Sequence, residues 1–326
     1  MHAHAYVPCE MRARTCVVIL IAVLCTGIAV HPGPATSAAQ PPAVRTVAIS
    51  YRAHDGRPRR AYLILPTWYG PQDDPPIPLV ISPHGRGVGA RTNARRWGDL
   101  PALGPFAVIN PEGQGRALTL YSWGDPGEIH DLARMPDILQ RAVPWLRIAR
   151  RRVYAVGGSM GGQETLLLVA RFPHLLAGAA AFDAPTNMAA RYRAFDTLPF
   201  GDGLQRLARR EIGGTPVTDP EGYEIRSPLD WARKIAFSRV PLQIWWSSRD
   251  TTVTDQTRES GLLYHDIMRL NPFAPVTQFV GTWAHTTEMK SHGYLPFALS
   301  RFGLLPPRAA PPANRDREHS AEKVLV

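Results

Sequence analysis

The sequence predicts an α/β fold, with a mostly parallel central sheet covered by helices on both faces. Short apolar runs, such as residues 79–82 and 153–156, have the length and composition of buried strands. Amphipathic helical patterns separate these runs, and such alternation is typical of βαβ units. The chain has 326 residues and 44% apolar residues, which is enough for one large core and excludes a disordered chain.

The predicted strands begin with a hairpin. Residues 44–51 alternate between polar and apolar positions, and residues 60–65 are their expected partner. The later strands are short, apolar and suited to burial on both faces of a sheet. They are predicted at residues 79–82, 106–111, 153–156, 177–182, 242–246 and 276–280.

Helical patterns lie between these strands. The first runs over residues 131–146, where apolar residues recur at steps of three and four. Pro136 falls in its first turn, where proline is tolerated, and Pro144 is expected to end or bend it. Two further helices are predicted over residues 164–172 and 261–270.

Two segments depart from the strand and helix pattern of the domain expected over residues 40–305. Residues 185–239 are rich in Arg, Gly and Pro and contain only short helical pieces, which indicates an insertion that can act as a lid. Residues 306–326 are rich in Pro, Arg and Glu, and we expect a disordered tail there.

Residues 1–39 have the pattern of a secretory signal peptide. Arg12 and Arg14 precede an apolar run over residues 16–30, and small residues follow at 35–39. The run is shorter than the roughly 20 apolar residues that a spanning helix needs. We therefore expect a secreted or extracytoplasmic protein, with a retained anchor and an association with the cell envelope as alternatives.

Charge and cysteine content narrow the function classes. The formal net charge is +10, but the arginines are scattered and match no nucleic-acid-binding module. All three cysteines, Cys9, Cys16 and Cys25, lie in the segment expected to be removed. We therefore expect no disulfide, no thiolate metal site and no cysteine nucleophile.

A nucleophile motif stands between a predicted strand and a predicted helix. Residues 157–161 read Gly-Gly-Ser-Met-Gly, with Ser159 at the centre. Glycines two positions before and after a serine allow a strained turn in which strand and helix pack closely. The alternative is a glycine-rich turn with a capping serine. A serine hydroxyl is a poor nucleophile without a base, so partners are required.

The order of the later strands predicts those partners. The acid of such a site follows a late strand and the histidine follows the last one. Asp250 follows residues 242–246, and His285 follows residues 276–280, so we predict a triad with Ser159. The alternatives are Asp255 for the acid, and His292 and His265 for the base.

Two backbone N–H groups are expected to stabilise a developing oxyanion. One belongs to Met160, directly after the nucleophile. The other is expected in the His-Gly-Arg-Gly loop at residues 84–87, where Arg86 is the first candidate and Gly87 the second. We expect His84 to hold this loop in place.

These motifs carry a resemblance to the α/β-hydrolase superfamily over about residues 44–305. Within it, the chain resembles the catalytic domains of prolyl-oligopeptidase-like (S9-type) peptidases and the secreted polyester-depolymerase and feruloyl-esterase group. It departs from them at Trp245 and Trp246, where many relatives have a His-Gly pair, and it shows no preceding β-propeller sequence.

The resemblance implies a serine hydrolase that cleaves a carboxylic ester, small or polymeric, through an acyl-enzyme on Ser159. A peptidase acting on short peptides and an envelope acyltransferase are the alternatives. No metal or organic cofactor is expected, no nucleic acid is an expected partner, and the oligomeric state stays open. Trp123, Trp246 and Trp283 lie near the expected catalytic edge and are candidate substrate-binding residues.

Overall fold

The computed structural model describes residues 43–308, in which every predicted strand is present. Eight strands form a sheet with the order β1-β2-β4-β3-β5-β6-β7-β8. The strands are β1 (Val44–Arg52), β2 (Pro58–Pro66), β3 (Ile77–Ile81), β4 (Ala107–Pro111), β5 (Ile148–Gly158), β6 (Gly178–Phe182), β7 (Leu242–Ser247) and β8 (Val276–Gly281).

Strand direction follows the prediction of a mostly parallel sheet. β1 pairs with β2, and β2 with β4, in antiparallel register. The other pairs of adjacent strands, from β4-β3 across the sheet to β7-β8, are parallel. The carboxyl ends of β5, β6, β7 and β8 therefore meet at one edge of the sheet, where a parallel α/β sheet places its functional loops.

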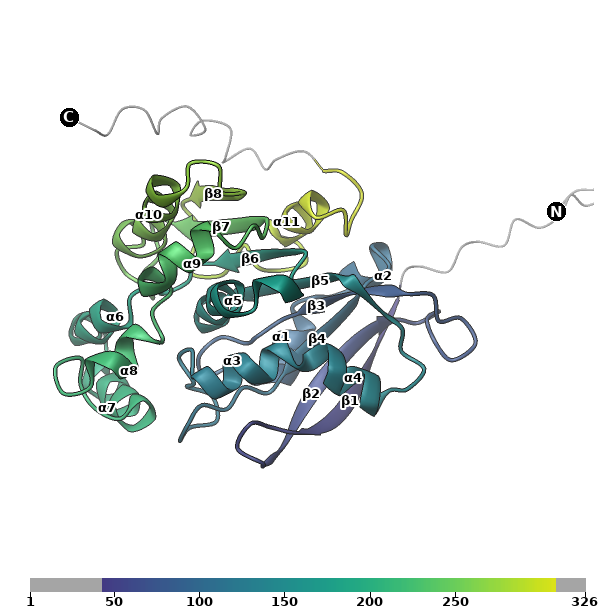
Figure 1. Ribbon diagram of the computed structural model, residues 1–326, viewed down its shortest axis with the longest axis horizontal. Helices are drawn as coiled ribbons and strands as arrows, with labels where there is room; N and C mark the ends of the chain where they lie inside the picture. Colours follow the sequence, from purple (N-terminus) through teal and green to yellow (C-terminus); the bar gives the residue numbers. More distant parts are fainter. Residues whose placement is uncertain (1–42, 309–326) are drawn as a thin grey trace, which may run out of the picture. The chain divides into compact units, whose positions relative to one another are not determined.

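Helices cover both faces of this sheet (Figure 1). They are α1 (Ala90–Arg95), α2 (Leu100–Leu103), α3 (Pro126–Ala133), α4 (Met135–Ala142), α5 (Met160–Arg171), α6 (Met188–Ala194), α7 (Gly201–Ile212), α8 (Pro220–Glu224), α9 (Ala232–Ala236), α10 (Leu262–Leu270) and α11 (Leu295–Arg301).

Alternation along the strands divides the apolar residues between two cores. Leu79 and Ile81 face a core that includes residues of α3, α4, α5, α9 and α10. Val80, between them, faces a second core that includes residues of α1 and α11. Because successive strand residues point to opposite faces, a strand as short as β3 needs apolar residues at every position.

One predicted helix proves to be two. The pattern over residues 131–146 contains the end of α3 and all of α4, with Arg134 between them. α3 begins earlier than predicted because the carboxylate of Asp125 caps the N–H groups of Gly127 and Glu128. Pro136 lies in the first turn of α4, and this helix ends before Pro144.

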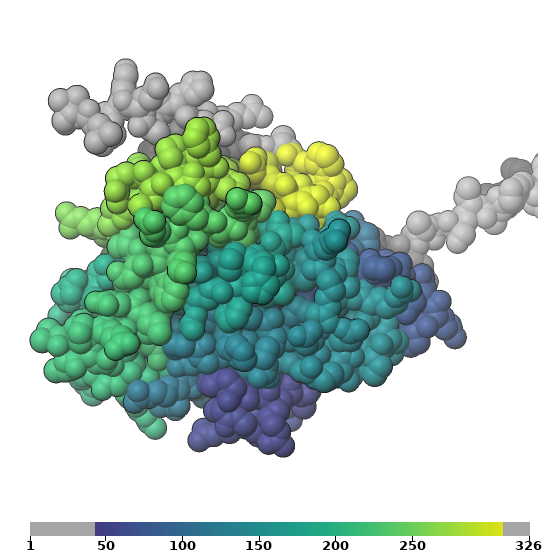
Figure 2. All heavy atoms as spheres, in the orientation of Figure 1, coloured from purple at the N-terminus to yellow at the C-terminus, as the bar shows by residue number. Residues whose placement is uncertain are grey.

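The segment at residues 185–239 is more helical than expected. α6, α7 and α8 lie beside one another (Figure 1) and share an apolar cluster that includes Phe195 and Tyr223. Met160, directly after the nucleophile candidate, belongs to the same cluster. We call α6, α7 and α8 the cap segment. Figure 2 shows its atoms, in green shades, against the teal atoms of the preceding chain.

The predicted signal peptide at residues 1–39 and most of the tail predicted at residues 306–326 lie outside the described residues. Within residues 43–308, no helix has the length and apolar character needed to cross a membrane.

Candidate active site

Ser159 occupies a sharp turn between β5 and α5. Its backbone has φ 58° and ψ −127°, a region that a residue with a Cβ adopts at a cost of about 1–3 kcal/mol. The Ser159 N–H donates to the carbonyl of Phe182 at 2.8 Å, which ties the turn to the end of β6. The half-buried side chain thus stands at the carboxyl edge of the sheet, at the first turn of α5.

The glycines around Ser159 are required by close packing. A Cβ on Gly161 would collide with the backbone carbonyl of Pro83, in the loop that leaves β3. A Cβ on Gly158 would lie 3.1 Å from Cγ2 of Thr286, in the loop that leaves β8. The turn is therefore enclosed by two of the loops from which its chemical partners were predicted, those after β3 and β8.

Asp250 and His285 are hydrogen-bonded to each other. Nδ1 of His285 donates to Oδ2 of Asp250 at 2.7 Å, and the N–H groups of Thr252 and Val253 donate to Oδ1 at 2.8 and 2.9 Å. Burial acts to raise the pKa of Asp250, but these hydrogen bonds outweigh it and hold that pKa below its usual range. The acid thus stays ionised and orients the imidazole.

The alternative partners lie elsewhere. Asp255 is exposed and interacts with Arg258 on its own turn. His292 is exposed, and His265 lies within α10, as predicted. Within residues 43–308, His285 is the histidine that contacts an acid predicted for the triad.

A second carboxylate, which the motifs did not identify, supports the histidine loop. Asp183 follows β6 directly and accepts hydrogen bonds from the N–H of Ser247 at 2.9 Å and of Thr286 at 2.7 Å. The indole N–H of Trp283 donates to the same carboxylate at 3.1 Å. The sequence signal that could have identified Asp183 is its position directly after β6, the strand that pairs with β7.

Asp183, Asp250 and His285 bring three potential metal ligands within 4.8 Å of one another. The donors already present argue against a cation, because all four carboxylate oxygens accept N–H hydrogen bonds. Oxygens directed at N–H donors do not offer a converging ligand set. Hydrogen bonds to His285 and to the surrounding N–H groups explain the cluster.

The loop after β3 is held by His84. The buried imidazole donates from Nδ1 to the carbonyl of Gly85 at 2.9 Å, and Nε2 accepts from the N–H of Gly113 at 2.9 Å. Burial lowers the pKa of His84, which favours the neutral ring that this bonding pattern requires.

The N–H groups of Arg86 and Met160, predicted as oxyanion donors, differ in their hydrogen bonding from the N–H of Gly87, the second candidate. The N–H of Gly87 donates to the carbonyl of Leu120 at 2.9 Å, so it is occupied. Among residues 43–308, no acceptor lies in hydrogen-bonding range of the N–H groups of Arg86 and Met160. Arg86 adjoins Gly85, whose Cβ position is 3.8 Å from Cβ of Ser159. These N–H groups thus stay available beside the nucleophile candidate.

The three tryptophans predicted to bind substrate have different surroundings. Trp123 lies in the cap-segment cluster with Met160, and its ring centre is 6.1 Å from that of Phe195. Trp283 donates to Asp183, so it supports the histidine loop. Trp246 belongs to the core on the α10 face, since successive β7 residues face opposite sides. We correct its assignment from substrate contact to core packing.

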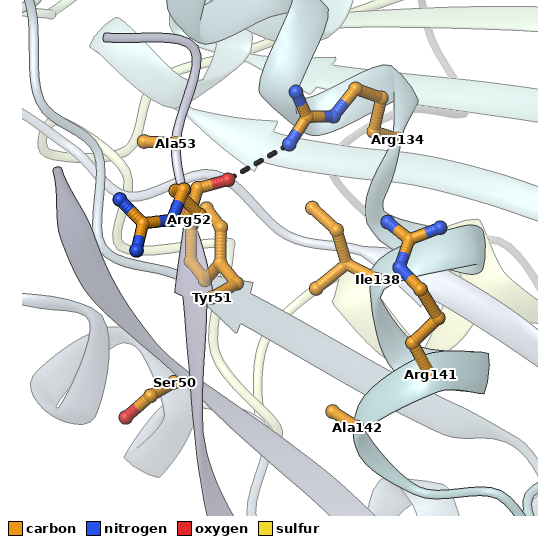
Figure 3. A pocket seen from close by; sticks show the side chains of 8 residues that line it. All are labelled: Ser50, Tyr51, Arg52, Ala53, Arg134, Ile138, Arg141 and Ala142. Carbon is orange, nitrogen blue, oxygen red and sulfur yellow. Dashed lines mark hydrogen bonds between the residues drawn. The ribbon is translucent and has the colours of Figure 1, made fainter. Parts of the chain in front are cut away.

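A separate surface hollow of about 450 Å³ lies between β1 and α4 (Figure 3). Arg134 and Arg141 line it, and Arg134 donates to the carbonyl of Arg52 at 2.9 Å. None of the predicted catalytic residues contributes to this hollow.

Glu288 is a buried acid next to Asp183. Burial, together with the negative charge of Asp183, raises the pKa of Glu288 to about 10. The unfolded chain releases this proton near the ordinary value of 4.5, so between these limits the folded state binds more protons. The contribution of Glu288 to folding stability must therefore fall as pH rises, by up to about 1.4 kcal/mol per pH unit.

We expect Glu288→Gln to remove this dependence. The melting temperature of the variant minus that of wild type, measured by thermal denaturation, should increase from pH 5 to pH 8. Glu221→Gln, at an exposed glutamate of α8, is the control. A difference that stays constant across this range would contradict the assignment of a proton to Glu288.

No protein-family model matches the sequence, and no curated protein is similar to it. Solved structures are similar in fold. Acylaminoacyl peptidase from Pyrococcus horikoshii has a TM-score of 0.59 at 16% identity, over 82% of this chain and 43% of its own. This chain thus spans less than half the length of that peptidase.

Two similar structures have lengths close to that of this chain. S-formylglutathione hydrolase from Staphylococcus aureus has a TM-score of 0.56 at 18% identity, over 74% of this chain and 92% of its own. An esterase from Pyrococcus furiosus has a TM-score of 0.54 at 18% identity, over 80% and 90%. Together with the strand order and the position of Ser159, these similarities show that the chain has the α/β-hydrolase fold.

Proposed function

We propose that the chain is a serine hydrolase in which Ser159 is the nucleophile. The observation that carries the proposal is the 2.7 Å hydrogen bond between His285 and Asp250, at the sheet edge where Ser159 stands in a strained turn. Packing alone does not explain why residues from the ends of three strands supply a nucleophile, a base and an orienting acid.

The proposed reaction uses the same groups in both of its half-reactions. Ser159 Oγ attacks the substrate carbonyl carbon, and Nε2 of His285 takes the hydroxyl proton. The N–H groups of Arg86 and Met160 stabilise the oxyanion. His285 then returns the proton to the leaving alcohol, and the C–O bond breaks to give the acyl-enzyme. Water attacks the acyl carbon in the second half, with His285 again as base, and releases the acid and Ser159.

Ser159→Ala is the direct test of this mechanism. We expect labelling by a fluorophosphonate probe to disappear and kcat to fall by at least about 10⁴-fold, because no other group replaces the nucleophile. The melting temperature should not fall, since alanine also fits this turn. Ser300→Ala, at a half-buried serine of α11, is the matched control outside the triad. Retained labelling in the Ser159 variant would exclude Ser159 as the nucleophile.

Within this class, we propose a carboxylic ester as the substrate. The support is that two of the structures similar in fold, an S-formylglutathione hydrolase and an esterase, are covered over 92% and 90% of their own length. We expect para-nitrophenyl esters to be hydrolysed at a kcat/KM at least about 100-fold above aminoacyl para-nitroanilides. The assay follows nitrophenolate or nitroaniline release with Ser159→Ala as blank. The opposite order would favour the peptidase, and acyl transfer to a sugar hydroxyl in preference to water would favour the acyltransferase.

We also propose that the enzyme acts outside the cytoplasm. The support is the charged start, apolar run and small residues within residues 1–39, together with the absence of cysteine from residues 40–326. We expect the exported protein to begin near residue 40 when its N-terminus is sequenced. A full-length chain retained in the membrane fraction would instead support an anchor.

A further inference from the structure

The guanidiniums of two arginines that pack against the cap-segment cluster have no hydrogen-bonded or ion-paired partner among residues 43–308. Arg191, on α6, is 4% exposed, and Nη1 of Arg86 is buried as well. Neither guanidinium donates a hydrogen bond to any residue of 43–308, and neither has a carboxylate within 4.0 Å there. A buried guanidinium normally has such a partner, because removing an ion from water is costly.

Two other buried arginines of the described chain show the usual arrangement. Arg59 and Arg226 are each 3% exposed, like Arg191. Arg59 pairs with Asp55 at 2.8 Å, and Arg226 pairs with Asp125 at 3.1 Å. Arg191 is thus an exception within its own fold, and its position next to the candidate site calls for a functional explanation.

The two guanidiniums share one aromatic neighbour. Cζ of Arg191 lies 4.9 Å from the ring centre of Phe195, and Cζ of Arg86 lies 5.9 Å from the same ring. Phe195 packs in the cap-segment cluster with Met160 and Trp123. Arg86 follows Gly85, which is next to Ser159. Both guanidiniums therefore pack against the cluster that contains Met160, the residue directly after Ser159.

The negative charges nearest to Arg191 are engaged elsewhere. Asp250 is bonded to His285, and Glu259 accepts from the N–H groups of Thr186 and Asn187 at 2.6 and 2.7 Å. Burial, and after it the positive charge of Arg86, lowers the pKa of Arg191 to about 10. At neutral pH both guanidiniums still carry charge. The charges of Glu259 and Asp250 offset part of the repulsion that Arg191 experiences, and an anion bound by both guanidiniums would offset the rest.

We propose that Arg86 and Arg191 together bind a carboxylate of the substrate, so that the enzyme prefers esters that bear a second, anionic end. This inference rests on the proposed serine hydrolase function. A guanidinium recognises a planar carboxylate through paired N–H donors, and the buried surroundings strengthen such a bond. Phe195 is fully buried and packs against both guanidiniums, so it holds them in position rather than contacting the substrate.

The test compares matched esters with and without a carboxylate. On the acyl side, the pair is the para-nitrophenyl monoester of glutaric acid and para-nitrophenyl pentanoate. On the leaving-group side, the pair is a carboxyphenyl and a phenyl pentanoate. Wild type should prefer the carboxylate member of one pair, and the preferred pair identifies the side that the arginines bind.

Arg191→Met keeps the length and apolar contact of the side chain and removes the charge. We expect the carboxylate-to-neutral ratio of kcat/KM to fall by about 10- to 100-fold, mainly through KM, because one charge-assisted hydrogen bond is lost. Arg191→Lys should restore part of this ratio. Arg193→Met, at an exposed arginine of the same helix, removes an equal charge and should leave the ratio unchanged.

Stability separates this role from a structural one. Replacing an unpaired buried charge by an apolar side chain should leave the melting temperature of Arg191→Met equal to or above that of wild type. A wild-type enzyme that hydrolyses the neutral esters without preferring either carboxylate ester would overturn the inference and leave the serine hydrolase proposal intact. If a fluorophosphonate probe does not label the wild-type enzyme, the serine hydrolase proposal itself is rejected.

Discussion

The carboxylate of Asp183 is the interaction on which the candidate site depends. It accepts N–H groups from the end of β7 and from two positions of the loop after β8. These are the segments that carry Asp250 and His285, so one buried group fixes the two loops relative to each other. The N–H of Asp183 in turn donates to the carbonyl of Trp245, which secures its own position at the end of β6. The sheet brings the strand ends together, and Asp183 converts that proximity into a defined geometry.

Much of the fold could be predicted because its signals are local. Short β-branched runs identified the strands, and the Gly-x-Ser-x-Gly turn identified Ser159 with its flanking strand and helix. The predicted start of the first helix, at residue 131, was wrong because Asp125 caps an earlier turn. Capping depends on a side-chain hydrogen bond, which the spacing of apolar residues does not reveal. The helices of the cap segment were underestimated for a related reason, since their apolar contacts are shared among short elements.

The features of the site that were missed depend on tertiary contacts. Asp183 resembles any aspartate at a strand end until its three N–H donors are known. Trp246 and Trp283 lie close to the predicted edge in sequence, yet one faces the core under α10 and the other donates to Asp183. The missing partner of Arg191 could not be inferred at all, because it is defined by distances to acids far away in the sequence. Local patterns therefore predict the candidate reacting groups, whereas the contacts that we propose for substrate selectivity join distant segments.

Three costly features occur at the same edge of the sheet. Ser159 has a strained backbone, Arg191 is a buried cation without a partner, and Glu288 is buried beside the negative Asp183. Away from this edge, the buried charges of Arg59 and Arg226 are paired, and apolar residues fill both faces of the sheet. Because a fold of this size is stabilised by only about 5–15 kcal/mol, unfavourable groups persist most readily where function requires them. In the proposed function Arg191 belongs to this group for the same reason as Ser159, since a bound anion would supply the partner that its buried charge lacks among residues 43–308.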